Sequence, residues 1–92
     1  MPREKQVRMQ CRKVLMQWGA KVIPYPGGSY GEAGTPDLIA CKNGRLILVE
    51  CKQPKKHLSP IQEVRFTEWR AVGAVCLEIH SGEELQGFLD GI

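Results

Sequence analysis

An apolar run that ends in a charged pair constrains the fold of this chain more than any other feature. Leu46 to Val49 are all apolar, and Glu50, Cys51 and Lys52 follow directly. A strand that is apolar on both faces is typical of the centre of a sheet covered on both sides. Alternate side chains of a strand share a face, so Glu50 and Lys52 are expected to project together and Cys51 away from them. The run therefore predicts an α/β fold built around this strand.

The remaining chain supplies the other elements of such a sheet. Apolar periodicity and turn residues predict helices over 3–18, 59–72 and 82–90, and strands over 21–25, 37–41, 45–52 and 74–79. Pro24 suggests that the first strand lies at an edge, and Asn43-Gly44 predicts a hairpin. Residues 26–36, with four glycines and two prolines, are expected to form a flexible loop. The order α-β-β-β-α-β-α predicts helices around a mixed four-stranded sheet, with the fourth strand parallel to the third.

Length and composition fit one globular domain over residues 1–92. The chain is 42% hydrophobic and 25% charged, and it contains no apolar run of membrane-spanning length. The N-terminus is polar and basic, unlike a secretory signal, so a cytoplasmic protein without a membrane partner is expected. No two of the four cysteines have C-x-x-C spacing, which argues against structural zinc or a disulfide framework. Buried free thiols are the prediction for all four.

Charge is distributed unevenly along the chain. Residues 1–70 hold all 13 Lys and Arg with six acids, whereas residues 71–92 hold four acids and no Lys or Arg. This asymmetry fits either a polyanionic partner or an ordinary solvated surface. His57 is interpreted as part of a basic patch with Lys55 and Lys56, and His80 as a residue at a strand end. Both are taken as lone histidines without partners that suggest zinc or a catalytic triad.

The polar ends of two neighbouring strands suggest a metal site. If the strands over 37–41 and 45–52 pair, Asp37 and Glu50 meet near one point. Mg²⁺ prefers oxygen ligands and keeps several waters, so these two carboxylates and the backbone carbonyl of Cys51 would suffice. Lys52 would hold or help deprotonate an attacking water and balance the charge of a phosphate. The competing interpretation is a turn residue at Asp37 and a solvated ion pair between Glu50 and Lys52.

Two further residues allow two interpretations each. Glu4 is either an acid that favours the dipole of the first helix or a further ligand of the metal. Gln62 fits a capping box with Ser59, in which its side chain bonds to the Ser59 backbone. Gln62 also heads a helix stripe that follows soon after Lys52, so a role in the site is equally open.

The ordered set of these motifs resembles the PD-(D/E)XK nuclease superfamily, and more narrowly its VRR-NUC family of virus-type replication–repair nucleases. The similarity covers nearly the whole chain and rests on Glu4, Gly34-x-Pro36-Asp37, Glu50-x-Lys52, Leu58-Ser59-x-x-Gln62 and Gly73. It implies a restriction-endonuclease-like core, metal at Asp37 and Glu50, catalytic support from Lys52, and active-site roles for Glu4 and Gln62. Arg65 departs from the family pattern, which favours an aromatic or aliphatic residue there.

The resemblance implies a Mg²⁺-dependent endonuclease, with Mn²⁺ as a substitute, that cuts branched DNA such as a four-way junction. Small members of the family look like homodimers from phages and bacteria, and Val64, the Gly-rich loop and the C-terminal helix are candidate dimer surfaces. Alternatives are a less selective duplex or nicking nuclease, an inactive DNA-binding module and a docking protein. The DNA contacts expected are Arg3, Lys5, Arg8, Arg12, Ser29, Tyr30, Lys55, Lys56 and His57.

Overall fold

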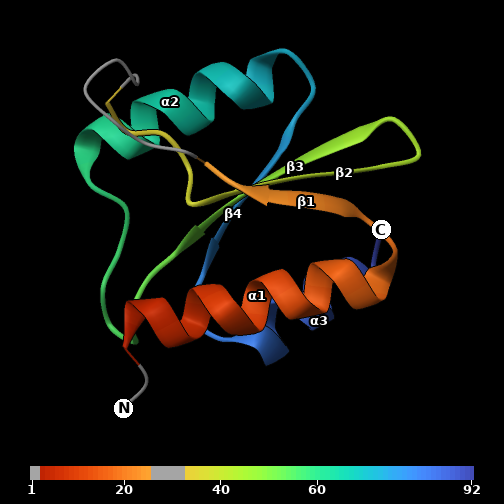
Figure 1. The fold of residues 1–92 in the computed structure, drawn as a ribbon. Coiled ribbons are helices and arrows are strands. Elements are labelled where there is room, and N and C mark those ends of the chain that lie inside the picture. The colour runs from red at the N-terminus through yellow and green to blue at the C-terminus, as the bar shows by residue number, and fades with distance from the viewer. Residues whose placement is uncertain (1–2, 26–32) are drawn as a thin grey trace.

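A computed structural model describes residues 3–25 and 33–92, which form three helices and four strands (Figure 1). The elements are α1 (Glu4–Trp18), β1 (Lys21–Pro24), β2 (Leu38–Lys42), β3 (Arg45–Cys51), α2 (Pro60–Ala71), β4 (Val75–Ile79) and α3 (Gly82–Asp90). Their order is the one predicted from the sequence. None of the described helices is long and apolar enough to cross a membrane.

The four strands form a single mixed sheet in the order β1-β2-β3-β4. The first three pair antiparallel, and β4 lies parallel to β3, as predicted. The tight turn between β2 and β3 has positive φ angles at Asn43 (51°) and Gly44 (78°), the backbone that Asn-Gly hairpins favour. Pro24 ends β1, which pairs with β2 alone in the described sheet, so its missing N–H is tolerated at an edge.

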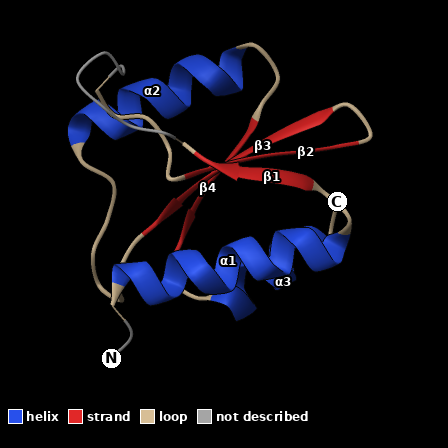
Figure 2. Cartoon of the chain, in the orientation of Figure 1, coloured by secondary structure: helices blue, strands red, loops and turns tan. Residues whose placement is uncertain are grey.

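Helices cover both faces of the sheet, with α1 and α3 on one side and α2 on the other (Figure 2). The larger core lies under α1 and α3, where Val7, Cys11 and Leu15 meet inward residues of all four strands. The smaller core lies under α2 around Leu48 and Phe66. The central position predicted for the third strand is therefore confirmed.

Strand alternation now fixes the face on which the polar end of β3 lies. Ile47, Val49 and Cys51 belong to the core under α1, whereas Leu48 belongs to the core under α2. Glu50 follows the alternation of Leu48, so its side chain lies on the α2 face. This arrangement brings β3, α2 and the start of α1 toward the same end of the sheet.

One prediction about the cysteines is wrong. Cys11, Cys51 and Cys76 are buried free thiols, but Cys41 is exposed. Cys41 lies near the end of β2, on the hairpin that extends away from α2 in Figure 1. An apolar neighbourhood in sequence does not bury a side chain where the strand extends beyond the covering helix.

Candidate active site

Three carboxylates from separate elements gather at one point. Glu4 is the first residue of α1, Asp37 directly precedes β2, and Glu50 is the penultimate residue of β3. One carboxylate oxygen from each lies within 4.8 Å of the others. The register explains the meeting of the last two, because Leu38 pairs with Val49 and the next residues outward are Asp37 and Glu50.

Asp37 is fixed by backbone contacts on two sides. Its Oδ2 accepts a hydrogen bond of 2.9 Å from the Cys51 N–H, and its carbonyl accepts one of 2.9 Å from the Tyr25 N–H. Asp37 therefore bridges the edge of β1 and the end of β3. The Cys51 N–H thus orients the Asp37 carboxylate, while the Cys51 carbonyl stays a predicted metal ligand.

The segment before Asp37 is held tightly against α2. Gly34 has a φ of 80°, and a Cβ at this position would lie 2.9 Å from the Ile61 carbonyl oxygen. Only glycine avoids both the strained backbone and this contact. The neighbouring Ala33 carbonyl accepts a hydrogen bond of 3.1 Å from Arg65 Nε. Arg65, the departure from the family pattern, thus helps to hold the loop that leads into Asp37.

Glu50 is buried with an incompletely satisfied carboxylate. It is only 3% exposed. Its Oε2 accepts a hydrogen bond of 3.0 Å from Gln62 Nε2 and lies 3.4 Å from Lys52 Nζ. Its Oε1 is buried without a hydrogen-bond partner among the described residues. Burial and the negative charge of Asp37 raise the pKa of Glu50 from 4.5 to about 7, although Lys52 opposes the shift.

This donor set fits a hard divalent cation. Three carboxylates that converge within 4.8 Å repel one another unless a positive charge joins them. The unpartnered Oε1 of Glu50 is the atom that such an ion would satisfy. Mg²⁺ and Mn²⁺ accept all-oxygen surroundings, so Glu4, Asp37 and Glu50 would hold either ion.

Gln62 forms the capping box and also contacts the carboxylate cluster, while its role in catalysis stays a prediction. The side-chain Oε1 of Gln62 accepts a hydrogen bond of 2.9 Å from the Ser59 backbone N–H. The Gln62 backbone N–H donates one of 3.3 Å to Ser59 Oγ, which completes the capping box. The other end of the same amide donates to Glu50. Glu4 is likewise both an acid in the first turn of α1 and a member of the carboxylate cluster.

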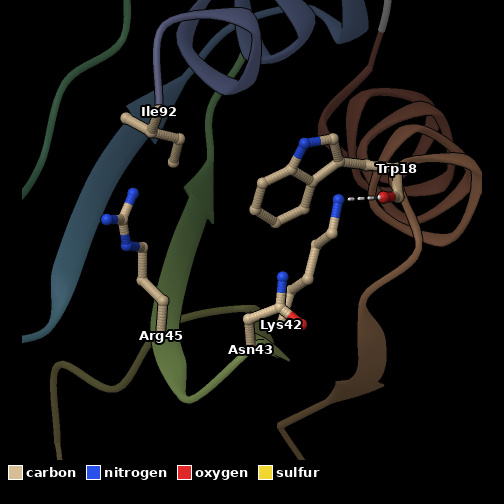
Figure 3. Close-up of a pocket in the computed structure, with 5 residues that line it drawn as sticks. All are labelled: Trp18, Lys42, Asn43, Arg45 and Ile92. Carbon is tan, nitrogen blue, oxygen red and sulfur yellow. Dashed lines mark hydrogen bonds between the residues drawn. The ribbon is translucent and has the colours of Figure 1, made fainter.

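A surface cavity opens beside Asp37. It has a volume of about 340 Å³ and is lined by Arg8, Pro24, Tyr25, Thr35, Pro36 and Asp37. The guanidinium of Arg8 and the carboxylate of Asp37 in this cavity suit a polar ligand near the cluster. Another cavity lies around Trp18 and Lys42, at the opposite end of α1 and ~21 Å along its axis from Glu4 (Figure 3). There Lys42 Nζ donates to the Trp18 carbonyl at 2.8 Å, so this contact joins the hairpin to α1.

Most of the predicted DNA contacts lie on the surface. Half-buried Arg8 lines the cavity, and Ser29 and Tyr30 fall outside the described residues. The exposed members are Arg3, Lys5, Arg12, Lys55, Lys56 and His57. Exposure permits contact with DNA, and the assignment of these residues stays a prediction.

The interpretation of His57 and His80 as lone residues is wrong. His57 Nδ1 lies 2.9 Å and His80 Nε2 lies 3.2 Å from Glu78 Oε2. The spacing of Glu78 and His80, two apart across a strand end, was a usable signal that they share a face. The path of the segment that carries His57 could not be read from local sequence.

Comparison with known proteins identifies the fold and the general class of the protein. A solved structure described as a "VRR_NUC domain" superimposes with a TM-score of 0.78 and 22% identity, over 95% of this chain and 94% of that chain. The predicted similarity to a VRR-NUC domain is thereby confirmed for the fold. The family model "Archaeal holliday junction resolvase (hjc)" matches residues 3–67. The chain belongs to this family, which places it in the nuclease class. No curated protein matches it.

Proposed function

We propose that the protein is a metal-dependent endonuclease that hydrolyses phosphodiester bonds in branched DNA. The observation that carries this proposal is the Glu4–Asp37–Glu50 cluster, with a buried and unpartnered Glu50 oxygen next to Lys52. Membership in a family named for Holliday junction resolution supports a four-way junction as the substrate. The proposed active site comprises Glu4, Asp37, Glu50, Lys52 and Gln62.

Each of these residues has a distinct task in the proposed reaction. Glu4, Asp37 and Glu50 would hold Mg²⁺ or Mn²⁺, with the Cys51 carbonyl as a further oxygen ligand. A cation bound there supplies Lewis-acid stabilisation of the negative charge that develops on the phosphate. Hydrolysis adds water to phosphorus and breaks one P–O bond, so the water must lose a proton and the leaving sugar oxygen must gain one.

Lys52 and Gln62 prepare the site for that reaction. The Lys52 side chain is only 16% exposed, and its Nζ lies 3.4 Å from Glu50 Oε2, where it can orient the water and offset phosphate charge. Gln62 fixes the rotamer of Glu50 through the hydrogen bond from its Nε2. The Cys51 N–H does the same for Asp37. The carboxylates are therefore preorganised by contacts outside the cluster itself.

Homodimerisation forms part of the proposal, since two active sites related by a twofold axis match a two-fold junction. Exposed apolar side chains at Val64 on α2 and Phe88 on α3, 49% and 50% exposed, are suitable contacts. Light scattering at micromolar concentration is expected to give the mass of two chains. A monomer under these conditions would remove the dimer from the proposal.

The test of function uses a labelled four-way junction and a linear duplex, each with Mg²⁺ or with EDTA. Metal-dependent cutting of the junction alone is expected. Asp37→Asn, Glu50→Gln and Lys52→Ala should abolish cutting and keep binding, while Glu83→Gln, an exposed acid on α3, should behave as wild type. Equal cutting of both substrates would instead support a less selective nuclease, and binding without cutting an inactive DNA-binding module.

A further inference from the structure

A second group of metal-ligating side chains lies beside the carboxylate cluster. Glu78 pairs with Glu50 across β3 and β4, so the two side chains lie on the same face of the sheet. His80 follows β4, and His57 comes from the segment between β3 and α2. One ligand atom from each of His57, Glu78 and His80 lies within 4.8 Å of the others.

The donor atoms differ in kind from those of the first cluster. Two imidazole nitrogens and one carboxylate oxygen suit Zn²⁺ and neighbouring transition metals, whereas Mg²⁺ prefers oxygen alone. Metal–ligand bonds of about 2.0–2.1 Å in a tetrahedron place neighbouring ligand atoms roughly 3.3 Å apart. The distances from Glu78 Oε2 to His57 and His80 are 2.9 and 3.2 Å. Glu78 Oε2 therefore needs to separate from each histidine nitrogen by only a few tenths of an ångström, ~0.4 Å in the case of His57.

Outer contacts orient two of the three ligands as in metal sites. His80 Nδ1 lies 3.3 Å from Glu84 Oε1, and Nε2, the other ring nitrogen, lies 3.2 Å from Glu78 Oε2. A carboxylate on the far ring nitrogen is a usual partner of a metal-binding histidine. The unused Glu78 Oε1 accepts 3.0 Å from the Leu58 N–H. These contacts are independent of the cluster distances and support the same conclusion.

The cluster lies at the surface of the protein. The His57 side chain is 72% exposed, so solvent reaches the cluster. His80 Nε2 donates a hydrogen bond of 2.7 Å to the Lys56 carbonyl oxygen, and a metal ion bound at Nε2 would replace this contact. Although burial alone would raise the pKa of Glu78, the Leu58 N–H and the two histidines lower it overall, which favours the ionised carboxylate.

We propose that His57, Glu78 and His80 form a binding site for a borderline divalent metal ion such as Zn²⁺, separate from the Glu4–Asp37–Glu50 cluster. Occupancy would attach the segment between β3 and α2 to the end of β4. That segment carries Lys55 and Lys56 and leads into Ser59 and Gln62, so the ion would stiffen the chain that positions Gln62. The site does not depend on the proposed nuclease activity.

Titration of the full chain with Co²⁺, a spectroscopic substitute for Zn²⁺, tests this site in excess Mg²⁺. Wild type should bind one Co²⁺ with the intense visible bands of tetrahedral nitrogen coordination, and one equivalent of Zn²⁺ should abolish them. His57→Asn and His80→Asn should lose the bands and weaken Zn²⁺ binding at least tenfold. Glu50→Gln should keep both signals, because it alters only the carboxylate cluster.

The outcomes separate this site from a hydrogen-bonded cluster without metal. Absence of the bands in wild type, or bands of wild-type strength in His57→Asn, would overturn the proposal. Loss of the bands in Glu50→Gln would place the ion in the other cluster and would overturn it as well. His57 is largely exposed, so its variant is expected to fold even if His80→Asn does not, and circular dichroism checks this.

Discussion

Glu50 should make the stability of the metal-free protein depend on pH in a direction opposite to that of most carboxylates. Burial raises its pKa from 4.5 to about 7, so the folded state keeps a proton that the unfolded state releases between these values. A shift of one unit corresponds to about 1.36 kcal/mol, so this shift corresponds to roughly 3 kcal/mol. Because the folded state binds more protons, the stabilisation is complete below pH 4.5 and is lost as pH rises through 7.

Urea denaturation in EDTA between pH 5 and pH 8, followed by the fluorescence of Trp18 and Trp69, measures this loss. Wild type should lose about 2.5 kcal/mol of unfolding free energy relative to Glu50→Gln across this range, because part of the loss already occurs below pH 5 and the amide cannot ionise. Glu83→Gln, a change at an exposed acid, should follow wild type. Glu78 should not contribute to this change. Its pKa is lowered, so the stability that it adds is lost only below this range, as pH falls through the lowered pKa.

A divalent cation should reverse the trend. Ligand carboxylates bind metal in the ionised form, so stabilisation by Mg²⁺ or Mn²⁺ should increase from pH 6 to pH 8 in wild type and be absent in Glu50→Gln. Identical pH slopes for wild type and Glu50→Gln in EDTA would refute the reasoning from burial. Equal stabilisation of both proteins by Mg²⁺ would refute the assignment of Glu50 as a ligand.

Three further predictions concern the residues around the cluster. Gly34→Ala should lower the free energy of unfolding by about 1–3 kcal/mol in urea denaturation and should slow cutting, because φ is positive at this residue and the added Cβ would meet the α2 backbone. Unchanged stability would contradict this. Gln62→Ala and Ser59→Ala should each lower the free energy of unfolding by about 1 kcal/mol through the lost cap, but only Gln62→Ala should strongly slow cutting. Equal cutting rates in the two variants would show that the contact with Glu50 does not contribute to activity. Replacing Lys55 and Lys56 by Ala should weaken junction binding and reduce its salt slope by about one per phosphate contact, and an unchanged slope would remove them from the interface.

The architecture was largely readable from the sequence because apolar periodicity and turn chemistry agree along the chain. The predicted helix over 82–90 matches α3, and the Asn43-Gly44 turn fixes the register that places Asp37 next to Glu50. Strand pairing is local here, so two of the three carboxylates could be expected together. The third, Glu4, depends on how α1 crosses the sheet, and no local pattern encodes that crossing.

What the sequence did not reveal depends on the paths of irregular segments. The contact of His57 with Glu78 requires the course of the chain between β3 and α2, which includes Lys55 at a positive φ of 69°. Local propensity disfavours that conformation for lysine, so a sequence pattern does not predict it. The exposure of Cys41 similarly depends on where α2 stops covering the hairpin.

The first turns of α2 connect the two halves of the candidate site. The backbone of Ile61 requires glycine at position 34, which shapes the approach to Asp37. One turn of helix further along, Arg65 bonds to the same loop. Gln62, between them, uses one end of its amide to begin the helix and the other to orient Glu50. Because the same cap begins the helix and aligns the carboxylates, a change that frays the start of α2 should reduce activity before it unfolds the sheet.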